Sequence, residues 1–232
     1  NRMTLIDTGY ERGFAHFKKQ LAKMQIAPQQ IRYIFLTHAH DDHAGYLNEI
    51  LSECSDIQIV MSDKALERLY KGQNSFHGGC TTKIALLFCF LMKFVGKGKH
   101  LFPPITQEYS CRCIQVTEQN RKQVELLLQG KIIDTPGHTA DSISLLTNDG
   151  SLFCGDAAMN GLPSLHRITI WAEDKTDFLK SWETIIALRP NLIYPGHGKP
   201  FGYDDLKINL KRAKNMELSL IHISEPTRRS YI

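Results

Sequence analysis

Four apolar segments of strand length in this chain each run into side chains of the kinds that bind metal ions. The segments are followed, in chain order, by HAHDDH at 38–43, PGH at 136–138, GD at 155–156 and PGH at 195–197. A single His or Asp at a strand end is more often a turn residue than a ligand. Four such endings in one chain favour a fold whose strands carry a metal site.

Strands and amphipathic helices alternate along the chain, as in layered α/β folds. Over 11–24, apolar residues recur at spacings of three and four, which predicts a helix. The same kinds of pattern predict strands at 3–7, 31–36, 57–61, 131–134, 142–146, 152–154 and 192–194, and helices at 44–54, 63–70, 174–188 and 204–217. We therefore expect an α/β protein.

The first cluster, His38 to His43, places three imidazoles and two carboxylates in six residues. His38 and His40 project the same way if the backbone is extended, so they can bind one metal ion together. Asp42 and His43, where the chain turns into a helix, can point to a second ion. Imidazole and carboxylate suit Zn, Fe or Mn. A solvated polar loop is the weaker alternative, because an uncompensated cluster would be costly to bury.

Segment 72–116 departs from the alternation and is expected to be an insertion or lid carrying one apolar helix at 84–95. As a lid over the metals, this helix would accept an acyl or other hydrophobic group of the substrate. As a core element, it would pack on the rest of the fold. We favour the core position, because a helix that is apolar all round is normally buried.

The composition of the chain argues against nucleic acid and membrane as partners. The chain has 232 residues and a net charge of +4, but its Lys and Arg are scattered, so we expect no nucleic acid partner. Segment 84–95 is too short to cross a bilayer, so we expect no membrane association. The six cysteines do not resemble a disulfide framework, and we expect free, mostly buried thiols and a cytoplasmic location. The Cys111-x-Cys113 pair is interpreted as incidental.

The motifs taken together resemble those of the metallo-β-lactamase-fold hydrolase superfamily. The matching motifs are Thr37-His38-x-His40-x-Asp42-His43-x-Gly45, Thr135-Pro136-Gly137-His138-Thr139, Gly155-Asp156 and Pro195-Gly196-His197-Gly198. The resemblance implies a four-layer αβ/βα sandwich with the metal site at one edge of the paired sheets. It also implies a ligand set: His38, His40 and His138 for a first metal, Asp42, His43 and His197 for a second, and Asp156 bridging them.

By this resemblance the chain is a metal-dependent hydrolase. A hydroxide bridging two divalent metal ions, Zn²⁺ first with Fe or Mn as alternatives, would attack the carbonyl of a small ester, lactone or thioester. Asp42 would be catalytic, carrying a proton to the departing atom. Met159 stands where acyl-lactone hydrolases of the family usually have Tyr.

Three alternatives remain. A mononuclear iron oxidoreductase, similar to persulfide dioxygenases, would use only His38, His138 and Asp156. A β-lactam hydrolase is disfavoured, because β-lactamases of the family carry Cys or a non-ligand at the position of Asp156. A metal-binding scaffold without turnover is the third.

The first residues and the last fifteen residues of the chain both depart from the expected pattern of the domain. The opening residues already form a strand, so we expect the family's first strands to be missing. Segment 218–232 breaks the amphipathic pattern before it, and we expect a non-native tail. Residues 1–217 are then a single metallo-hydrolase domain.

Overall fold

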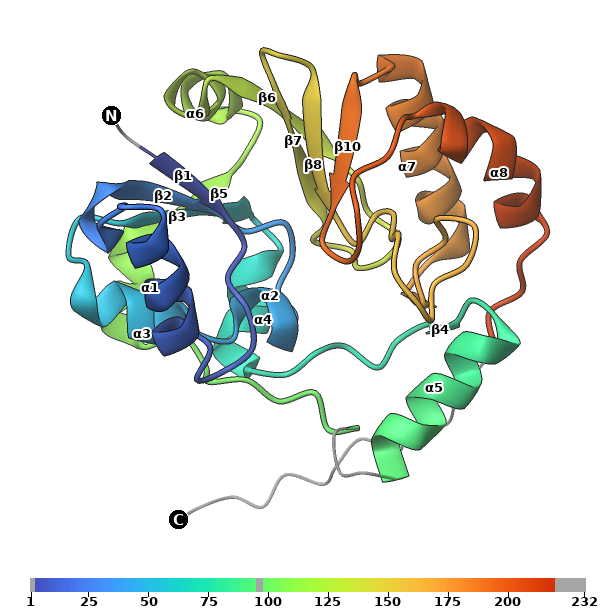
Figure 1. Ribbon diagram of the computed structural model, residues 1–232, viewed down its shortest axis with the longest axis horizontal. Coiled ribbons are helices and arrows are strands. Elements are labelled where there is room, and N and C mark those ends of the chain that lie inside the picture. The colour runs from blue at the N-terminus through green and yellow to red at the C-terminus, as the bar shows by residue number, and fades with distance from the viewer. Residues whose placement is uncertain (1–2, 95–97, 220–232) are drawn as a thin grey trace.

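The structure, a computed structural model, describes residues 3–94 and 98–219 and contains two four-stranded sheets (Figure 1). The first sheet is parallel, in the order β1 (Met3–Ile6), β2 (Ile31–Phe35), β3 (Gln58–Ser62) and β5 (Cys113–Val116). The second has the order β10 (Leu192–Pro195), β8 (Ser151–Gly155), β7 (Ile143–Thr147) and β6 (Gly130–Asp134). It is antiparallel except for the β8–β10 pair.

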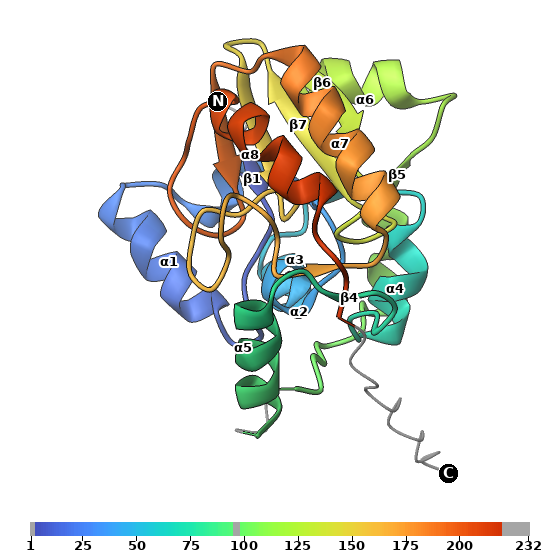
Figure 2. The same ribbon diagram turned by 90° about the vertical axis from the view of Figure 1, so that its right-hand side faces the viewer.

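Helices cover the outer face of each sheet (Figures 1 and 2). Over the first sheet lie α1 (Phe14–Lys23), α3 (Leu47–Glu53) and α4 (Ala65–Lys71). Over the second lie α7 (Lys175–Leu188) and α8 (Asp204–Lys214). Helix α6 (Arg121–Leu128) packs at the edge strand β6.

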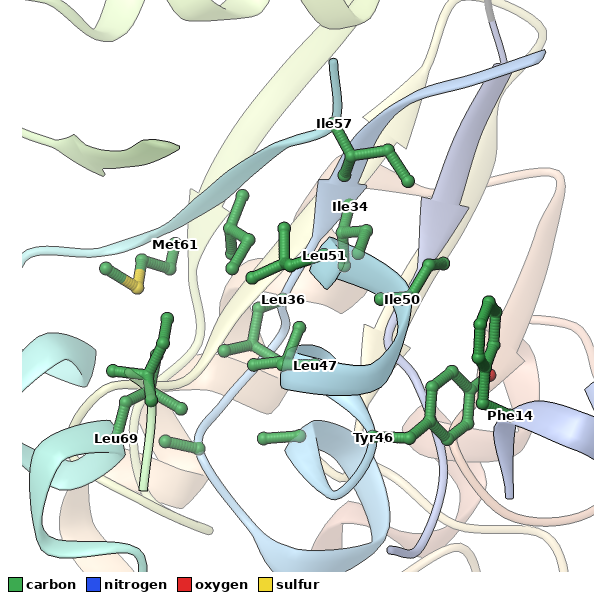
Figure 3. Packing of buried hydrophobic residues seen from close by; sticks show 14 of the residues in the cluster. Phe14, Ile34, Leu36, Tyr46, Leu47, Ile50, Leu51, Ile57, Met61 and Leu69 are labelled. Atoms are coloured by element: carbon green, nitrogen blue, oxygen red, sulfur yellow. The ribbon is translucent and has the colours of Figure 1, made fainter. Parts of the chain in front are cut away.

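Three apolar clusters fill the three spaces between these layers. One lies between the first sheet and its helices (Figure 3), one between the second sheet and its helices, and one between the two sheets. Strand β2 serves two of them, because Ile34 faces the helices while Tyr33 and Phe35 face the other sheet. This is why its sequence is nearly continuously apolar. The expected four-layer αβ/βα sandwich is confirmed.

Most predicted elements occur within a few residues of the expected bounds, and helix 44–54 is the main exception. It is divided into α2 (Asp41–Ala44) and α3, with Gly45 and Tyr46 between them. The backbone of residues 9–11 passes so close to Gly45 that a side chain there would collide with it. Strand β5 and helix α6 were not predicted.

Helix α5 (Lys83–Phe94) corrects the expectation for segment 84–95. It stands apart from the layers in both ribbon views, and among its residues only Ala85 is buried (Figures 1 and 2). Phe90 is 61% exposed and Phe94 85%. The short strand β4 (Gly79–Cys80), which precedes the helix, pairs with β9 (Trp171–Ala172). This pairing attaches the strand before the helix to residues 171–172 of the second half of the chain. The helix itself lies outside the apolar core.

All six cysteines are free, as expected, but only Cys54, Cys80 and Cys154 are buried. Of the segment expected to be a tail, Leu218 packs against the apolar cluster of the second sheet and Ser219 bridges to Cys80. Residues 220–232 lie outside the described residues. None of the helices within 3–94 and 98–219 has both the length and the apolar character needed to cross a bilayer.

Candidate metal centre

Each predicted ligand lies just beyond a strand end, and the fold brings all of them together where the two sheets meet. The loop after β2 carries His38 and His40, α2 carries Asp42 and His43, and the loops after β6, β8 and β10 carry His138, Asp156 and His197. Two of these segments come from the first half of the chain and three from the second.

The first predicted group is assembled. His38, His40 and His138 are buried, and each offers a ring nitrogen within 4.8 Å of the others. His138 Nε2 and His40 Nδ1 lie 3.1 Å apart. The spacing permits one ion to contact three imidazole nitrogens.

The second predicted group is also assembled. Asp42, His43 and His197 offer ligand atoms within 4.8 Å of one another, and His197 Nε2 lies 2.9 Å from Asp42 Oδ2. His197 is the most exposed of these side chains, at 36%. The group is therefore open on one side.

Asp156 lies between the two groups. Its Oδ1 is 3.6 Å from His43 Nε2, while its Oδ2 is 3.6 Å from His138 Nε2 and 3.5 Å from His197 Nε2. Its Oδ2 thus faces one imidazole of each group, and its Oδ1 faces a further imidazole of the second group.

Several buried polar atoms of the cluster have no hydrogen-bond partner within the described part of the chain. They are Nε2 of His38, His40 and His43, and Oδ1 of Asp156. Burying such atoms unpaired costs free energy. Since they are imidazole nitrogens and a carboxylate oxygen gathered in one place, divalent metal ions fit them.

Burial and neighbouring charges set the protonation of the cluster. Burial lowers the pKa of His38 and His40 well below the usual value, so both are neutral at pH 7. Burial opposes ionisation of Asp42 and Asp156, but the neighbouring histidines outweigh it, lowering the pKa of Asp42 and bringing that of Asp156 to about 2. His38, His40, Asp42 and Asp156 are therefore in the forms that bind metal, neutral imidazole and ionised carboxylate. Neighbouring carboxylates instead raise the pKa of His43 and His197, so these two imidazoles would release a proton when they bind metal.

Asp7 is a buried residue in contact with the cluster that we did not predict. Its carboxylate accepts hydrogen bonds from His43 Nδ1 (2.8 Å) and from the amide (2.6 Å) and hydroxyl (2.8 Å) of Thr37. The bond to Nδ1 orients His43 so that Nε2 faces the cluster. Asp7 follows strand β1 directly, so the strand-end pattern that identified Asp156 could also have identified it.

Asp7→Asn should weaken metal binding by roughly 10- to 100-fold, since partners that orient a ligand histidine have effects of this size. The amide keeps the shape of the side chain but loses the charge that favours the productive His43 tautomer. Competition with a chromogenic chelator measures the change. Asp63→Asn, an exposed carboxylate just after β3, is the control and should bind metal like the unmodified protein. Equal affinity in both variants would contradict the role of Asp7.

An ion network of one half-buried arginine and two buried carboxylates joins the two halves of the site. Arg68 on α4 forms two hydrogen bonds with Glu173, at 2.6 and 2.9 Å, and its Nε lies 3.2 Å from Asp141. Asp141 accepts a hydrogen bond from the amide of Ala39, between His38 and His40. Glu173 accepts one from the amide of Ala140, near His138. Sequence patterns gave no signal for this network.

Gly196 leaves space that the cluster requires. A Cβ at this position would lie 2.6 Å from both Asp156 Oδ1 and His43 Cε1. We expect Gly196→Ala to displace one of these side chains and to lower metal content below that of the unmodified protein, measured by elemental analysis. Gly202→Ala is the matched control, because a Cβ there meets no atom within 4 Å. A Gly196→Ala protein with full metal content would show that the cluster tolerates this displacement.

Two facing sheets define a protein of the αβ/βα sandwich class, and the His and Asp side chains at their strand ends form groups that could hold metal ions. The chain belongs to the metallo-beta-lactamase superfamily, whose sequence model matches residues 1–197.

Relatives agree with this assignment. The chain is 26% identical to the beta-lactamase-like protein 2 homolog of Drosophila melanogaster, covering 97% of this chain and 66% of the relative. It is 25% identical to a hydroxyacylglutathione hydrolase of Nitrosococcus oceani, covering 84% and 59%. An archaeal metallo-beta-lactamase superfamily protein from Sulfolobus tokodaii shares the fold, with a TM-score of 0.57, 19% identity and coverage of 97% and 80%. The chain spans about half to two thirds of the length of the curated relatives it matches first.

Proposed function

We propose that this protein is a metal-dependent hydrolase that cleaves an ester, lactone or thioester bond of a small molecule. The observation that carries the proposal is the position of Asp156, whose carboxylate lies within 3.6 Å of imidazoles from both groups. We assign His38, His40 and His138 to a first divalent ion, Asp42, His43 and His197 to a second, and Asp156 to both. Zn²⁺ is the expected metal, with Fe or Mn as alternatives.

The bound ions would supply an acidified water ligand near neutral pH and positive charge beside the carbonyl oxygen. Asp42 lines the cavity in front of the cluster and is held ionised beside His43 and His197. It accepts a proton from the attacking water and transfers it to the departing oxygen or sulfur. The water oxygen forms the new bond to the carbonyl carbon, the bond to the leaving atom breaks, and the products are a carboxylate and an alcohol or thiol.

Two observations support hydrolysis over the oxidoreductase alternative. The relative from Nitrosococcus oceani is named for the hydrolysis of a hydroxyacylglutathione. The second ligand group, which a mononuclear iron oxidoreductase would leave unused, is assembled as closely as the first.

The test combines metal analysis with a substrate panel. Protein purified without added metal should contain about two divalent ions per chain and should hydrolyse at least one ester, lactone or thioester in a panel that also includes phosphodiesters and β-lactams. One iron per chain with sulfide-dependent oxygen uptake would replace the proposal with the oxidoreductase. Full metal content with no turnover of any substrate would support the scaffold alternative.

A further inference from the structure

Three exposed apolar side chains of α5, Leu87, Phe90 and Phe94, line a cavity that is also lined by the His/Asp cluster. This cavity has a volume of about 1100 Å³. Its lining includes His40, Asp42, His138, Asp156 and His197 from the cluster, and most residues of α5. The cluster and the apolar helix therefore share one space.

The part of the lining outside the cluster is mainly apolar. Leu87 and Phe90 contribute from α5, and Met159, Leu162 and Ile170 contribute from the second half of the fold. Leu162 is 88% exposed and Leu87 59%. Exposed apolar side chains gathered around one cavity mark a binding site, because they gain free energy when an apolar ligand covers them.

The charges in the lining argue against a strongly anionic substrate. No arginine lines the cavity within the described ranges, and the lysines are Lys83 and Lys93, on α5. Asp41 is also in the lining and makes hydrogen bonds with Asn74. A phosphodiester or a polyanionic carrier would find no guanidinium here to bind its phosphates.

We propose that the substrate of this site is a long-chain acyl ester or thioester whose acyl chain lies along α5 while its carbonyl reaches the cluster. This proposal rests on the proposed function and specifies its substrate class. The volume of the cavity exceeds the roughly 300–1000 Å³ that holds typical small ligands, so an acetyl group would leave most of it unfilled. Hydrolysis releases the fatty acid and the alcohol or thiol.

The test is a series of thioesters with one leaving group, N-acetylcysteamine, and acyl chains from acetyl through octanoyl to palmitoyl. Each added methylene buried in the cavity should raise kcat/KM by up to about fourfold, until the chain fills the apolar space. We expect the octanoyl thioester to exceed the acetyl thioester by at least about a hundredfold.

Two equivalent substitutions on α5 provide the control. Leu87 lines the cavity, whereas Leu91 does not, and the two are 59% and 53% exposed. Leu87→Gln should lower the octanoyl-to-acetyl ratio of kcat/KM several-fold, and Leu91→Gln should leave it unchanged. Metal content should be the same in both variants, which excludes damage to the cluster.

Binding of the product gives a second readout that needs no turnover. Trp171 lines the cavity, while Trp182 is fully buried in the core, so a cavity ligand should change the fluorescence of Trp171. Octanoate should half-saturate this change at a concentration at least tenfold below that of butanoate. Leu87→Gln should weaken octanoate binding in this measurement, whereas Leu91→Gln should leave it unchanged.

The outcomes distinguish the two proposals. Hydrolysis with no dependence on chain length would overturn the long-chain acyl substrate and leave the hydrolase proposal intact. Preferential binding of octanoate without hydrolysis of any ester, lactone or thioester would contradict the proposed function while supporting the apolar site. A dimer that Leu91→Gln dissociates would assign α5 to a second copy of the chain and overturn the inference.

Discussion

Asp156→Asn should remove at least one metal ion per chain and lower the rate of hydrolysis by more than about a hundredfold. The amide nitrogen cannot act as the second oxygen ligand, and losing a bound ion forfeits several kcal/mol of transition-state charge stabilisation. Elemental analysis of dialysed protein and steady-state kinetics on the best substrate of the panel measure the two effects.

Asp134→Asn is the matched control for this substitution. Asp134 also ends a strand, β6, but its carboxylate is 63% exposed and pairs with Arg121. An exposed pair of this kind contributes at most about 1 kcal/mol, so metal content and activity should not change. Full metal content and activity in Asp156→Asn would refute the bridging role.

Arg68→Met should lower the free energy of unfolding by about 3–5 kcal/mol, because it leaves the buried carboxylates of Glu173 and Asp141 without their cation. Urea unfolding measures the loss. Lys71→Met, on the same helix, breaks an exposed ion pair with Glu67 and should cost less than about 1 kcal/mol.

Removing the unpaired charges should restore part of this loss. In the background of Arg68→Met, Glu173→Gln and Asp141→Asn replace both carboxylates with neutral groups that still accept hydrogen bonds from Ala140 and Ala39. If Arg68→Met unfolds at the same urea concentration as Lys71→Met, the network is not a structural link between the two halves.

The residues of the candidate metal centre could be predicted to lie together because each belongs to a local motif. His38 and His40 directly follow the strand that presents them, and the Pro-Gly turns before His138 and His197 mark strand ends in the sequence. The local sequence also predicts strand β2. Its nearly uninterrupted apolar run is explained by burial of both faces of the strand.

Residues that act across long sequence separations could not be predicted in this way. Arg68 and Glu173 are 105 positions apart, and Asp7 and His43 are 36 apart, so no spacing rule connects them. Helix α6 was missed for a different reason. Its buried Val124 and Leu128 are separated by the exposed Leu126 and Leu127, which obscure the helical period.

The position of α5 shows what an apolar pattern leaves open. Its composition predicts that something apolar covers the helix, but the pattern does not say whether that cover is the protein's own core or a ligand. The position of the helix follows from the strand that precedes it. Strand β4 pairs with β9, and α5, which follows β4, lines the cavity.

The candidate ligands come from both halves of the chain, so metal binding would affect how the two halves are held together. His38, His40, Asp42 and His43 belong to the half of the chain that builds the first sheet, whereas His138, Asp156 and His197 belong to the half that builds the second. Bound metal would therefore act as a cross-link between the two halves, in addition to the apolar side chains packed between the sheets. Any fluctuation that separates the sheets would have to release metal first, so free metal concentration would control how often the molecule opens along this seam.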